Sequence, residues 1–501
     1  MVYWNGSLHP EEMLMTTDTR SFLSQADYLS LDATAMAEGV RNGALAPEAL
    51  LRTALERCDQ LDPQVNAVVM RHDEIAFAQL RARQAAGTER QGALAGVPML
   101  LKDLNTYLAG TVTTNGSRLL ADAPPASSNS TIVDRYLNAG MLVFGKSASP
   151  EFGMTTTTES AQWGRTVNPW HAGFSAGGSS GGAAAAVAAG IVPVAHATDG
   201  GGSIRIPASY CGVFGMKPTR YRNPQGPASF EGWFGASCGH VVSRTVRDSA
   251  LLLDVSHGHE RGSPYWLAEP PRSFSDEVAR TPGALRIGVV SADMTGTALH
   301  PEIAEVLEQT VDMLRELGHQ VRPLTLPVDP QRLYAAHGTT SGVSLLAAVR
   351  DREAALGRPM PAHALETVTG QVLEQASQAS SEQLYRARRD FEAIGLQMEM
   401  LFDEIDLILS PVTGQLTPPL GRVSLQNSYE EYIKHIVGSI GFTVLANVSG
   451  QPAMSVPLGM SREGLPIGMM FSAAHCQEGL LFQLAGQLEQ HRPWACIPAQ
   501  H

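Results

Sequence analysis

The spacing of apolar residues predicts helices in the first part of the chain. Between residues 30 and 90, the segments ATAMAEGVRNGALAPEALLRTALERC and NAVVMRHDEIAFAQLRARQAA carry apolar side chains at intervals of three and four residues. This interval places them on one face of a helix, where they can pack against a core. We therefore expect residues 1–90 to form an N-terminal helical region packed on the rest of the protein.

From residue 95 to residue 250 the pattern changes to short apolar runs bounded by Gly, Ser, Thr and Pro. The runs GVPMLLKD, GMLVFGKS and GIVPVAHATD are typical of buried strands, and residues 129–139 have helical spacing. Strands that alternate with helices indicate an α/β protein. We predict a large mixed, mainly parallel twisted sheet covered by helices on both faces.

A second α/β stretch follows a polar, proline-rich connection at residues 259–283. It contains the predicted strands LRIGVVS and HQVRPLTLP, and helices are predicted at 301–317 and within 340–403. DLILSP and NVSGQPAMSVPLG return to a strand-like pattern, before a final helix from about 478 to 490. Within one compact unit we distinguish four parts: the helical region 1–90, a core at 91–258, an inserted lobe at 259–405, and residues 406–501 completing the core.

Composition and charge narrow the classes of function. The chain has 501 residues, with 36 basic and 49 acidic side chains and a net charge of −13. This negative field repels phosphate backbones, so no nucleic-acid partner is expected. The most apolar run, 183–194, is too short to cross a membrane.

The cysteines and the start of the chain bear on its compartment. The five cysteines include no C-x-x-C pair, which favours reduced thiols in the cytoplasm. The start, MVYWNGSLHPEEM, lacks the pattern of a signal peptide.

The stretch GFSAGGSSGG at 173–182 is the first candidate for chemistry. Its first five letters fit the G-x-S-x-G turn of α/β-hydrolases, with Ser175 as nucleophile. However, Pro169 precedes it where a central strand is needed, and the following glycines make a poor helix start. A flexible linker is also disfavoured, because the stretch runs directly into the small-residue helix AAAAVAAG.

A second glycine-rich turn, ATDGGGSIRIPAS, follows the next predicted strand. It places Ser203 24 residues after Ser179, a distance that a short helix and a returning strand can close. Two further interpretations remain open. His196 and Asp199 lie near Ser203, as a Ser-His-Asp site requires, although a histidine in an apolar strand is usually a core residue. The segment His257–Glu260 could bind a metal, but it lies in a polar connection without helical spacing.

Together these segments resemble the amidase signature family of serine hydrolases. GGSSGG at 177–182 and DGGGSIRIPA at 199–208 resemble its signature block, and AGVPMLLKDL at 95–104 resembles its lysine strand. GKSASPEFGM, GRTVNPW, GVFGMKPTR and NVSGQPAMSVPLG match in order. Several pieces most resemble the 6-aminohexanoate-cyclic-dimer hydrolase branch. The resemblance implies the amidase signature fold, Ser203 as nucleophile, Ser179 as bridging serine and Lys102 as base, with a cis peptide between Gly178 and Ser179.

The residues at these positions suit such chemistry. A lysine can act as a base only where burial keeps it neutral, and Lys102 ends an apolar strand. The glycines before Ser203 let successive N–H groups converge on a developing oxyanion, so we predict an oxyanion hole from the N–H groups of Gly200, Gly201, Gly202 and Ser203. Asp199 and Arg205 are predicted to form an ion pair that braces this turn. We expect Ser175 and Ser180 to form local hydrogen bonds at a loop and helix start, or to lie near the rim of the pocket.

The substrate is less well specified. Phe230, Trp233 and Phe234 are candidates for a pocket wall, and they could equally belong to the core. In the branch named above, a cysteine from the middle of the chain is associated with the substrate site; here Ser341 falls near that place. We expect a cofactor-free, metal-free amidohydrolase for small, aryl or oligomeric amides, with esters and carbamates as further substrates. A homodimer is considered, and the alternative function is the glutamine-hydrolysing subunit of a tRNA-dependent amidotransferase.

Overall fold

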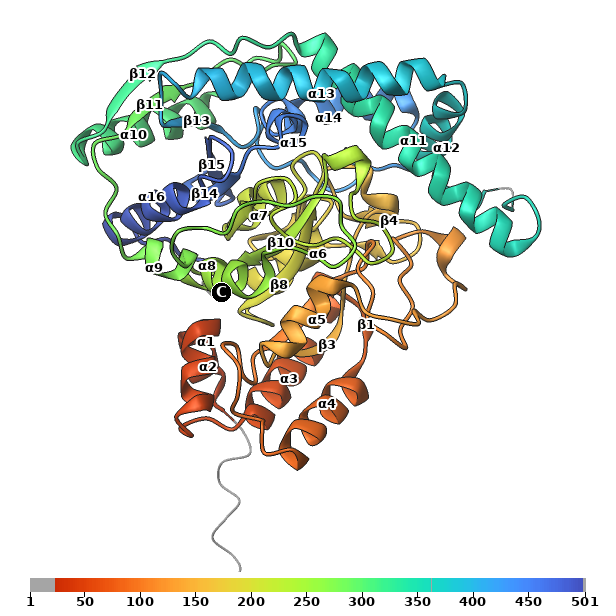
Figure 1. Cartoon of the computed structure of the whole chain (residues 1–501), viewed down its shortest axis with the longest axis vertical. Coiled ribbons are helices and arrows are strands. Elements are labelled where there is room, and N and C mark those ends of the chain that lie inside the picture. The colour runs from red at the N-terminus through yellow and green to blue at the C-terminus, as the bar shows by residue number, and fades with distance from the viewer. Residues whose placement is uncertain (1–22, 362, 499–501) are drawn as a thin grey trace, which may run out of the picture.

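The protein is built on one eleven-stranded sheet, seen in a computed structural model that describes residues 23–361 and 363–498 (Figure 1). The strand order is β1-β3-β2-β8-β10-β9-β14-β15-β13-β11-β12. Strands from as far apart as residues 68 and 473 therefore share this sheet, and two small two-stranded sheets lie apart from it within residues 159–175. The strands are β1 (Val68–Arg71), β2 (Pro98–Lys102), β3 (Leu142–Ser147), β8 (Val194–Asp199), β9 (Phe214–Lys217), β10 (Cys238–Ser243), β11 (Arg286–Val289), β12 (Gln320–Pro323), β13 (Leu407–Pro411), β14 (Ala453–Met460) and β15 (Pro466–Ala473).

The sheet is mixed as predicted, but the prediction that it is mainly parallel is wrong. Parallel pairing joins β2 with β3 and β8, and β11 with β12 and β13. The other neighbours, from β8 through β10, β9, β14 and β15 to β13, and β1 with β3, are antiparallel. The β14–β15 hairpin, which turns at Gly464, explains part of this difference, because a short turn can only join antiparallel strands.

Helices cover both faces of the sheet. Along β14 and β15, Met454 and Phe471 belong to an apolar cluster with α8, α9, α10 and α16, whereas Ala453 and Met470 pack with α7, α13 and α15. Successive side chains of a strand point to opposite faces, so the two groups of helices lie on opposite sides. The principal helices are α1 (Gln25–Ser30), α2 (Ala33–Arg41), α3 (Pro47–Val65), α4 (Asp73–Ala85), α5 (Thr131–Asn138), α6 (Gly181–Ala188), α7 (Arg205–Cys211), α8 (Val246–Ser256), α9 (Phe274–Val278), α10 (Pro301–Glu316), α11 (Pro330–Leu356), α12 (Thr367–Ser377), α13 (Ser381–Leu401), α14 (Tyr429–Ile440), α15 (Val444–Ser449) and α16 (Glu478–His491).

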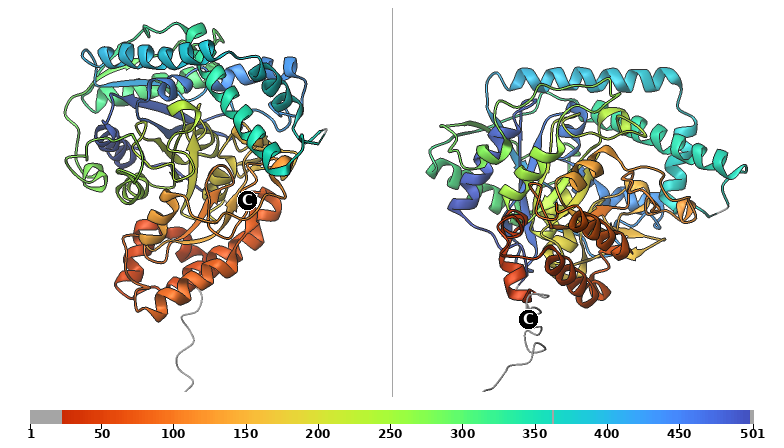
Figure 2. Two further views of the ribbon diagram at one scale, coloured as in Figure 1. Left: turned by 45° about the vertical axis from the view of Figure 1, so that its right-hand side comes forward. Right: turned by 60° about the horizontal axis from the view of Figure 1, so that its bottom comes forward.

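The ends of the molecule are formed by different parts of the chain. Helices α1 to α4 gather at one end, and the long helix α13 lies across the opposite end (Figures 1 and 2). The predicted start of the N-terminal region and the segment considered for a signal peptide fall in residues 1–22, outside the described part. Within the described part, none of the helices combines the length and apolarity needed to span a lipid bilayer.

Two local predictions need correction. Val68–Arg71, predicted as helix, is the edge strand β1 and pairs with β3. Asn447–Ser449, the start of a segment predicted as strand-like, form the end of helix α15 (Val444–Ser449), after which Gly450 adopts a positive φ of 86°. In both cases apolar residues in a short run do not distinguish a buried helix from a strand.

The arrangement of β2 and β8 positions the candidate site. These parallel neighbours end at Lys102 and Asp199, and parallel strands deliver their carboxyl ends to the same edge of a sheet. The glycine-rich turn before α6 and the turn between β8 and α7 lie at this edge. The backbone N–H of Ser180 donates to the carbonyl oxygen of Ser203 at 3.3 Å, which holds the two turns together.

Candidate active site

Lys102 lies at the centre of the site and is fully buried. Its Nζ is within hydrogen-bonding distance of three hydroxyl oxygens: 2.8 Å from Ser179, 2.9 Å from Ser180 and 2.9 Å from Thr198. Burial lowers the pKa of Lys102 well below its usual value, and the opposing attraction of the Asp199 carboxylate is the smaller effect. The environment therefore favours a neutral amine in contact with hydroxyl groups.

Ser179 is presented by a turn that only glycine can make at this place. The peptide bond between Gly178 and Ser179 is cis. A Cβ at Gly178 would lie 2.5 Å from the carbonyl oxygen of Thr157 and 2.6 Å from its nitrogen, so any side chain would collide with backbone. Ser179 is thus held with its side chain toward Lys102 and at the wall of a cavity that it shares with Ser203.

Ser180 and Thr198 contact the lysine although the sequence interpretation gave neither a role in the site. Ser180 makes the local contacts expected of it, since its Oγ donates to the carbonyl oxygen of Thr198 at 3.1 Å, but it also contacts Lys102 Nζ. A sequence signal did exist for Thr198: it is a polar residue at the end of an apolar strand, one position before Asp199.

A buried ion pair braces the turn that carries Ser203. The Arg205 guanidinium donates to Asp199 at 2.9 Å, and both side chains are inaccessible to solvent. Burial alone would raise the pKa of Asp199, but Arg205 outweighs it and holds that pKa below its usual range. Asn447, from α15, donates to Asp199 at 2.8 Å and accepts from Arg205 at 2.6 Å, so a segment remote in sequence completes the network.

Three protein groups fix the orientation of the peptide units before Ser203. His337 Nε2 donates to the carbonyl oxygen of Gly200 at 2.8 Å, and Thr443 Oγ1 donates to that of Gly201 at 2.7 Å. The N–H of Gly202 donates to Asp199 at 2.8 Å. This last bond corrects the predicted oxyanion hole, because the Gly202 N–H already has an acceptor. Within the described chain, the N–H groups of Gly200, Gly201 and Ser203 have no protein acceptor.

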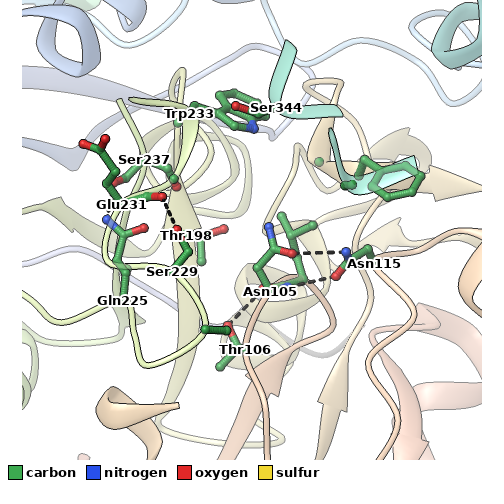
Figure 3. A pocket seen from close by; sticks show the side chains of 18 of the residues that line it. Asn105, Thr106, Asn115, Thr198, Gln225, Ser229, Glu231, Trp233, Ser237 and Ser344 are labelled. Carbon is green, nitrogen blue, oxygen red and sulfur yellow. Dashed lines mark hydrogen bonds between the residues drawn. The ribbon is translucent and has the colours of Figure 1, made fainter. Parts of the chain in front are cut away.

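Two cavities meet at Ser203. The first cavity, about 600 Å³, is lined by Ser179, Ser203 and many polar side chains. Figure 3 shows Asn105 and Asn115 on one side of it and Gln225 and Ser229 on the other. The second cavity, about 450 Å³, lies against α11, α12 and α14.

The predicted pocket residues are divided between these cavities. Trp233 lines both, Phe234 lines the first and Ser341 the second. Phe230 lies outside both cavities, packed against Gly226 and Gly262, so its assignment to the pocket wall is wrong. Its neighbours Ser229 and Glu231 do line the first cavity, so the ring of Phe230 alone is directed elsewhere, which the pattern of aromatic residues does not reveal.

The competing interpretations find no geometric support. Ser175 is buried, accepts a hydrogen bond from the N–H of Gly177, and lines neither cavity. His196 is a buried strand residue whose pKa burial lowers to about 3, with Lys102 and His240 as further causes. Among the described residues it forms no hydrogen bond with Asp199 or Ser203. The same residues contain no cluster of three or more His, Cys, Asp or Glu side chains that could hold a metal ion.

Removing one partner of the buried ion pair is expected to destabilise the protein strongly. Asp199→Ala leaves the Arg205 charge buried without its counter-ion, which costs about 3–5 kcal/mol. Chemical denaturation followed by fluorescence should show a clear fall in the unfolding midpoint. Glu382→Ala, which removes an exposed ion pair with Arg386, is the matched control and should change stability by no more than about 0.5 kcal/mol. Equal effects of the two substitutions would contradict a bracing role.

The fold and this site define a class of protein: an α/β hydrolytic enzyme of the amidase family. The chain matches the Amidase family over residues 49–482, and it belongs to that family. It is therefore a hydrolase that acts on amide C–N bonds.

Individual relatives support this placement. The chain is 35% identical over 475 residues to the 6-aminohexanoate-cyclic-dimer hydrolase of Paenarthrobacter ureafaciens, covering 92% of this chain and 95% of that protein. The structure of a 6-aminohexanoate cyclic dimer hydrolase complexed with substrate superposes with a TM-score of 0.88 at 34% identity, over 93% of this chain and 98% of the other. A bacterial aryl acylamidase of the amidase signature family superposes with a TM-score of 0.84 at 28% identity, over 93% and 97% of the two chains.

Proposed function

We propose that the protein hydrolyses carboxylic amides through an acyl-enzyme, with Ser203 as nucleophile, Ser179 as proton bridge and Lys102 as base. The observation that carries this proposal is the 2.8 Å contact between Lys102 Nζ and Ser179 Oγ in a fully buried setting. A serine hydroxyl is a weak nucleophile and needs a group that takes its proton as it attacks. A neutral amine can do this, whereas an ammonium ion cannot.

The hydrogen bonds around Lys102 determine which hydroxyl group can give its proton to the amine. A neutral amine has two N–H donors and one lone pair, which matches three hydroxyl neighbours. Ser180 uses its own hydrogen toward the carbonyl oxygen of Thr198, so it accepts from Lys102. With Thr198 as the second acceptor, the lone pair faces Ser179. Ser179 can then give its proton to Lys102 while it accepts one from Ser203.

The same relay returns a proton to the leaving group. After attack, Lys102 is protonated and Ser179 can pass a proton to the departing amine nitrogen. Water then attacks the ester on Ser203, with the relay again removing a proton. The negative charge that develops on the carbonyl oxygen in both steps would be stabilised by N–H groups among Gly200, Gly201 and Ser203, whose donors have no competing protein acceptor in the described chain.

The proposed substrates are small, aryl or oligomeric amides, with esters and carbamates as further candidates. The 6-aminohexanoate cyclic dimer, which appears in the names of the relatives, is one such amide. The alternative function, a glutamine-hydrolysing amidotransferase subunit, is disfavoured because the relatives reported above are named for hydrolysis of other amides. Hydrolysis of a panel of anilides, linear and cyclic oligoamides, carbamates and glutamine tests the proposal; activity on glutamine alone would contradict it.

The pH profile should report the ionisation of Lys102. Because the neutral amine is the active form and burial lowers the pKa of Lys102, kcat/KM should rise with pH and level off well below pH 10.5. Initial rates measured under conditions where chemistry limits turnover would show this. A rise centred on the ordinary lysine pKa of about 10.4, or a fall in kcat/KM as the pH increases, would contradict a buried neutral base.

His337 should act as a positioning residue for the oxyanion donors. Its Nε2–H holds the Gly200 carbonyl, and in a planar peptide the N–H of Gly201 points the opposite way. His337→Leu is expected to lower kcat about 10- to 100-fold with little change in KM. His337→Gln, whose amide N–H can reach the same carbonyl, should restore most of kcat. A loss that is equal in both variants, or confined to KM, would contradict this role.

A further inference from the structure

The two cavities that meet at Ser203 differ in chemical character. They share Ser203, Trp233, Gly153 and Met154, so a molecule bound at Ser203 can extend into both. An amide has two substituents, one on the carbonyl carbon and one on the nitrogen. The site therefore offers one cavity to each half of a substrate.

The second cavity is lined without any Asp, Glu, Lys or Arg side chain. Ile206, Val372, Ile436 and Ile440 give it apolar walls from α7, α12 and α14. Its one titratable imidazole, His337, is held neutral because burial lowers its pKa. Burying a charged group here would require removing its water without replacing it by a counter-ion. A neutral, apolar group fits this cavity.

The first cavity differs from the second in carrying negative charge. Amide and hydroxyl side chains such as those of Asn115, Gln225 and Ser344 line it (Figure 3). Glu231 and Asp351 line it as well, without a lysine or arginine among the lining residues. Among residues 23–361 and 363–498, neither carboxylate takes part in a salt bridge. This cavity suits a group that is neutral or positively charged.

The position of Ser179 decides which half of the amide enters which cavity. Ser179 lines the first cavity and not the second. In the relay proposed above, Ser179 protonates the leaving nitrogen, so that nitrogen must lie within hydrogen-bonding distance of Ser179 Oγ. The amine half then extends into the first cavity. The acyl half, on the other side of the carbonyl carbon, extends into the second.

We propose that the protein selects amides with an uncharged apolar acyl group and an amine half that is neutral or cationic. The second cavity is the acyl site and the first cavity is the amine site. This inference rests on the proposed function, because the relay fixes the direction of the substrate. It predicts that amides with a carboxylate in either half are poor substrates.

Primary amides test the acyl site, because their amine half is constant and minimal. We expect kcat/KM, measured by ammonia release from acetamide to octanamide, to rise up to about fourfold per methylene until the cavity is filled. Ile433→Asn, at the partly exposed rim of the second cavity, should lower the ratio of kcat/KM for octanamide to kcat/KM for acetamide. Leu396→Asn, on the exposed face of α13, is the control and should behave as wild type. No gain with chain length in the wild-type enzyme would overturn the acyl assignment.

The amine site is tested with two hexanoyl amides that differ only in terminal charge. We expect the amide of a diaminoalkane to be hydrolysed with a kcat/KM about tenfold above that of the amide of an ω-amino acid of equal length. Asp351→Asn should narrow this ratio, and Asp312→Asn, which lies away from both cavities, should not. A preference for the carboxylate-bearing amide would overturn the assignment. Labelling of Ser203 by a fluorophosphonate distinguishes failure of this inference from failure of the proposed function. If Ser203 is labelled but the predicted selectivity is absent, only the inference is refuted. If Ser203 is not labelled, the proposed function is refuted as well.

Discussion

Ser203→Ala is expected to lower kcat for amide hydrolysis by about four orders of magnitude or more, with a small effect on KM. The substitution removes the proposed nucleophile and leaves both cavities, the Lys102 contacts and the Asp199–Arg205 pair in place. Ammonia or amine release by the purified variant measures the loss, and its circular dichroism spectrum and melting temperature should match those of the wild type.

Ser175→Ala is the matched control for this experiment. Ser175 is a buried serine in the same glycine-rich stretch, and it lines neither cavity. Its variant should keep the wild-type kcat in the folded fraction. Full activity of Ser203→Ala would contradict Ser203 as the nucleophile. Inactivity of a folded Ser175→Ala would favour the G-x-S-x-G interpretation, in which Ser175 is the nucleophile.

Lys102→Met should lower kcat by about three orders of magnitude or more, since it removes the base while roughly keeping the side-chain length. The rate at which a fluorophosphonate labels Ser203 should fall in parallel, because the serine loses the group that takes its proton. Lys102→Arg should also be inactive: a guanidinium stays protonated and has no lone pair to offer. Lys102→Arg keeps the positive charge that Lys102→Met removes, so inactivity of both variants shows that the site needs a base and not a charge.

Lys146→Met provides the control for loss of a buried lysine. Lys146 lies on β3, opposite Leu101 of β2, and its Nζ donates to the carbonyl oxygen of Val112 at 2.7 Å. It lines neither cavity, so its variant should lose stability but keep kcat per folded molecule. Activity in Lys102→Arg close to that of the wild type would contradict a neutral base.

The sequence predicts the positions of Lys102, Asp199 and the glycine-rich turns better than it predicts the groups around them. Lys102 and Asp199 end apolar runs that form β2 and β8, and glycine-rich turns follow strands at the edge where the carboxyl ends meet. These are local signals, since a strand, a turn and a helix start are each encoded within a few residues. Their convergence follows from the parallel pairing of β2 and β8.

The groups that complete the site could not be predicted in this way. His337, Thr443 and Asn447 come from α11 and from the start and interior of α15, more than 130 residues after the turns that they contact. A polar residue in a predicted helix gives no indication of which distant carbonyl or carboxylate it will meet. The pairing of strands in the middle of the sheet is likewise set by contacts between distant segments, which explains the error about parallel strands.

The residues that line the cavities could be predicted from the sequence only in part. Trp233 and Phe234 line cavities and Phe230, a few residues earlier, does not, because the path of the loop and not its composition decides which rings face the site. The second cavity depends on α11, α12 and α14. Their polar and apolar faces are defined by packing against one another as well as against the sheet.

In the proposed mechanism, the neutral amine of buried Lys102 activates Ser203 through the hydroxyl group of Ser179, and the acyl group of the substrate is transferred to Ser203. Rapid quenching during turnover, followed by mass spectrometry, measures this step directly. Trypsin releases residues 166–205 as one peptide containing serines 175, 179, 180 and 203, so fragment ions must locate the added mass. We expect the acyl mass on Ser203, appearing and decaying at rates that account for turnover. Turnover without any acylated peptide, or with the acyl group on another of these serines, would contradict the mechanism.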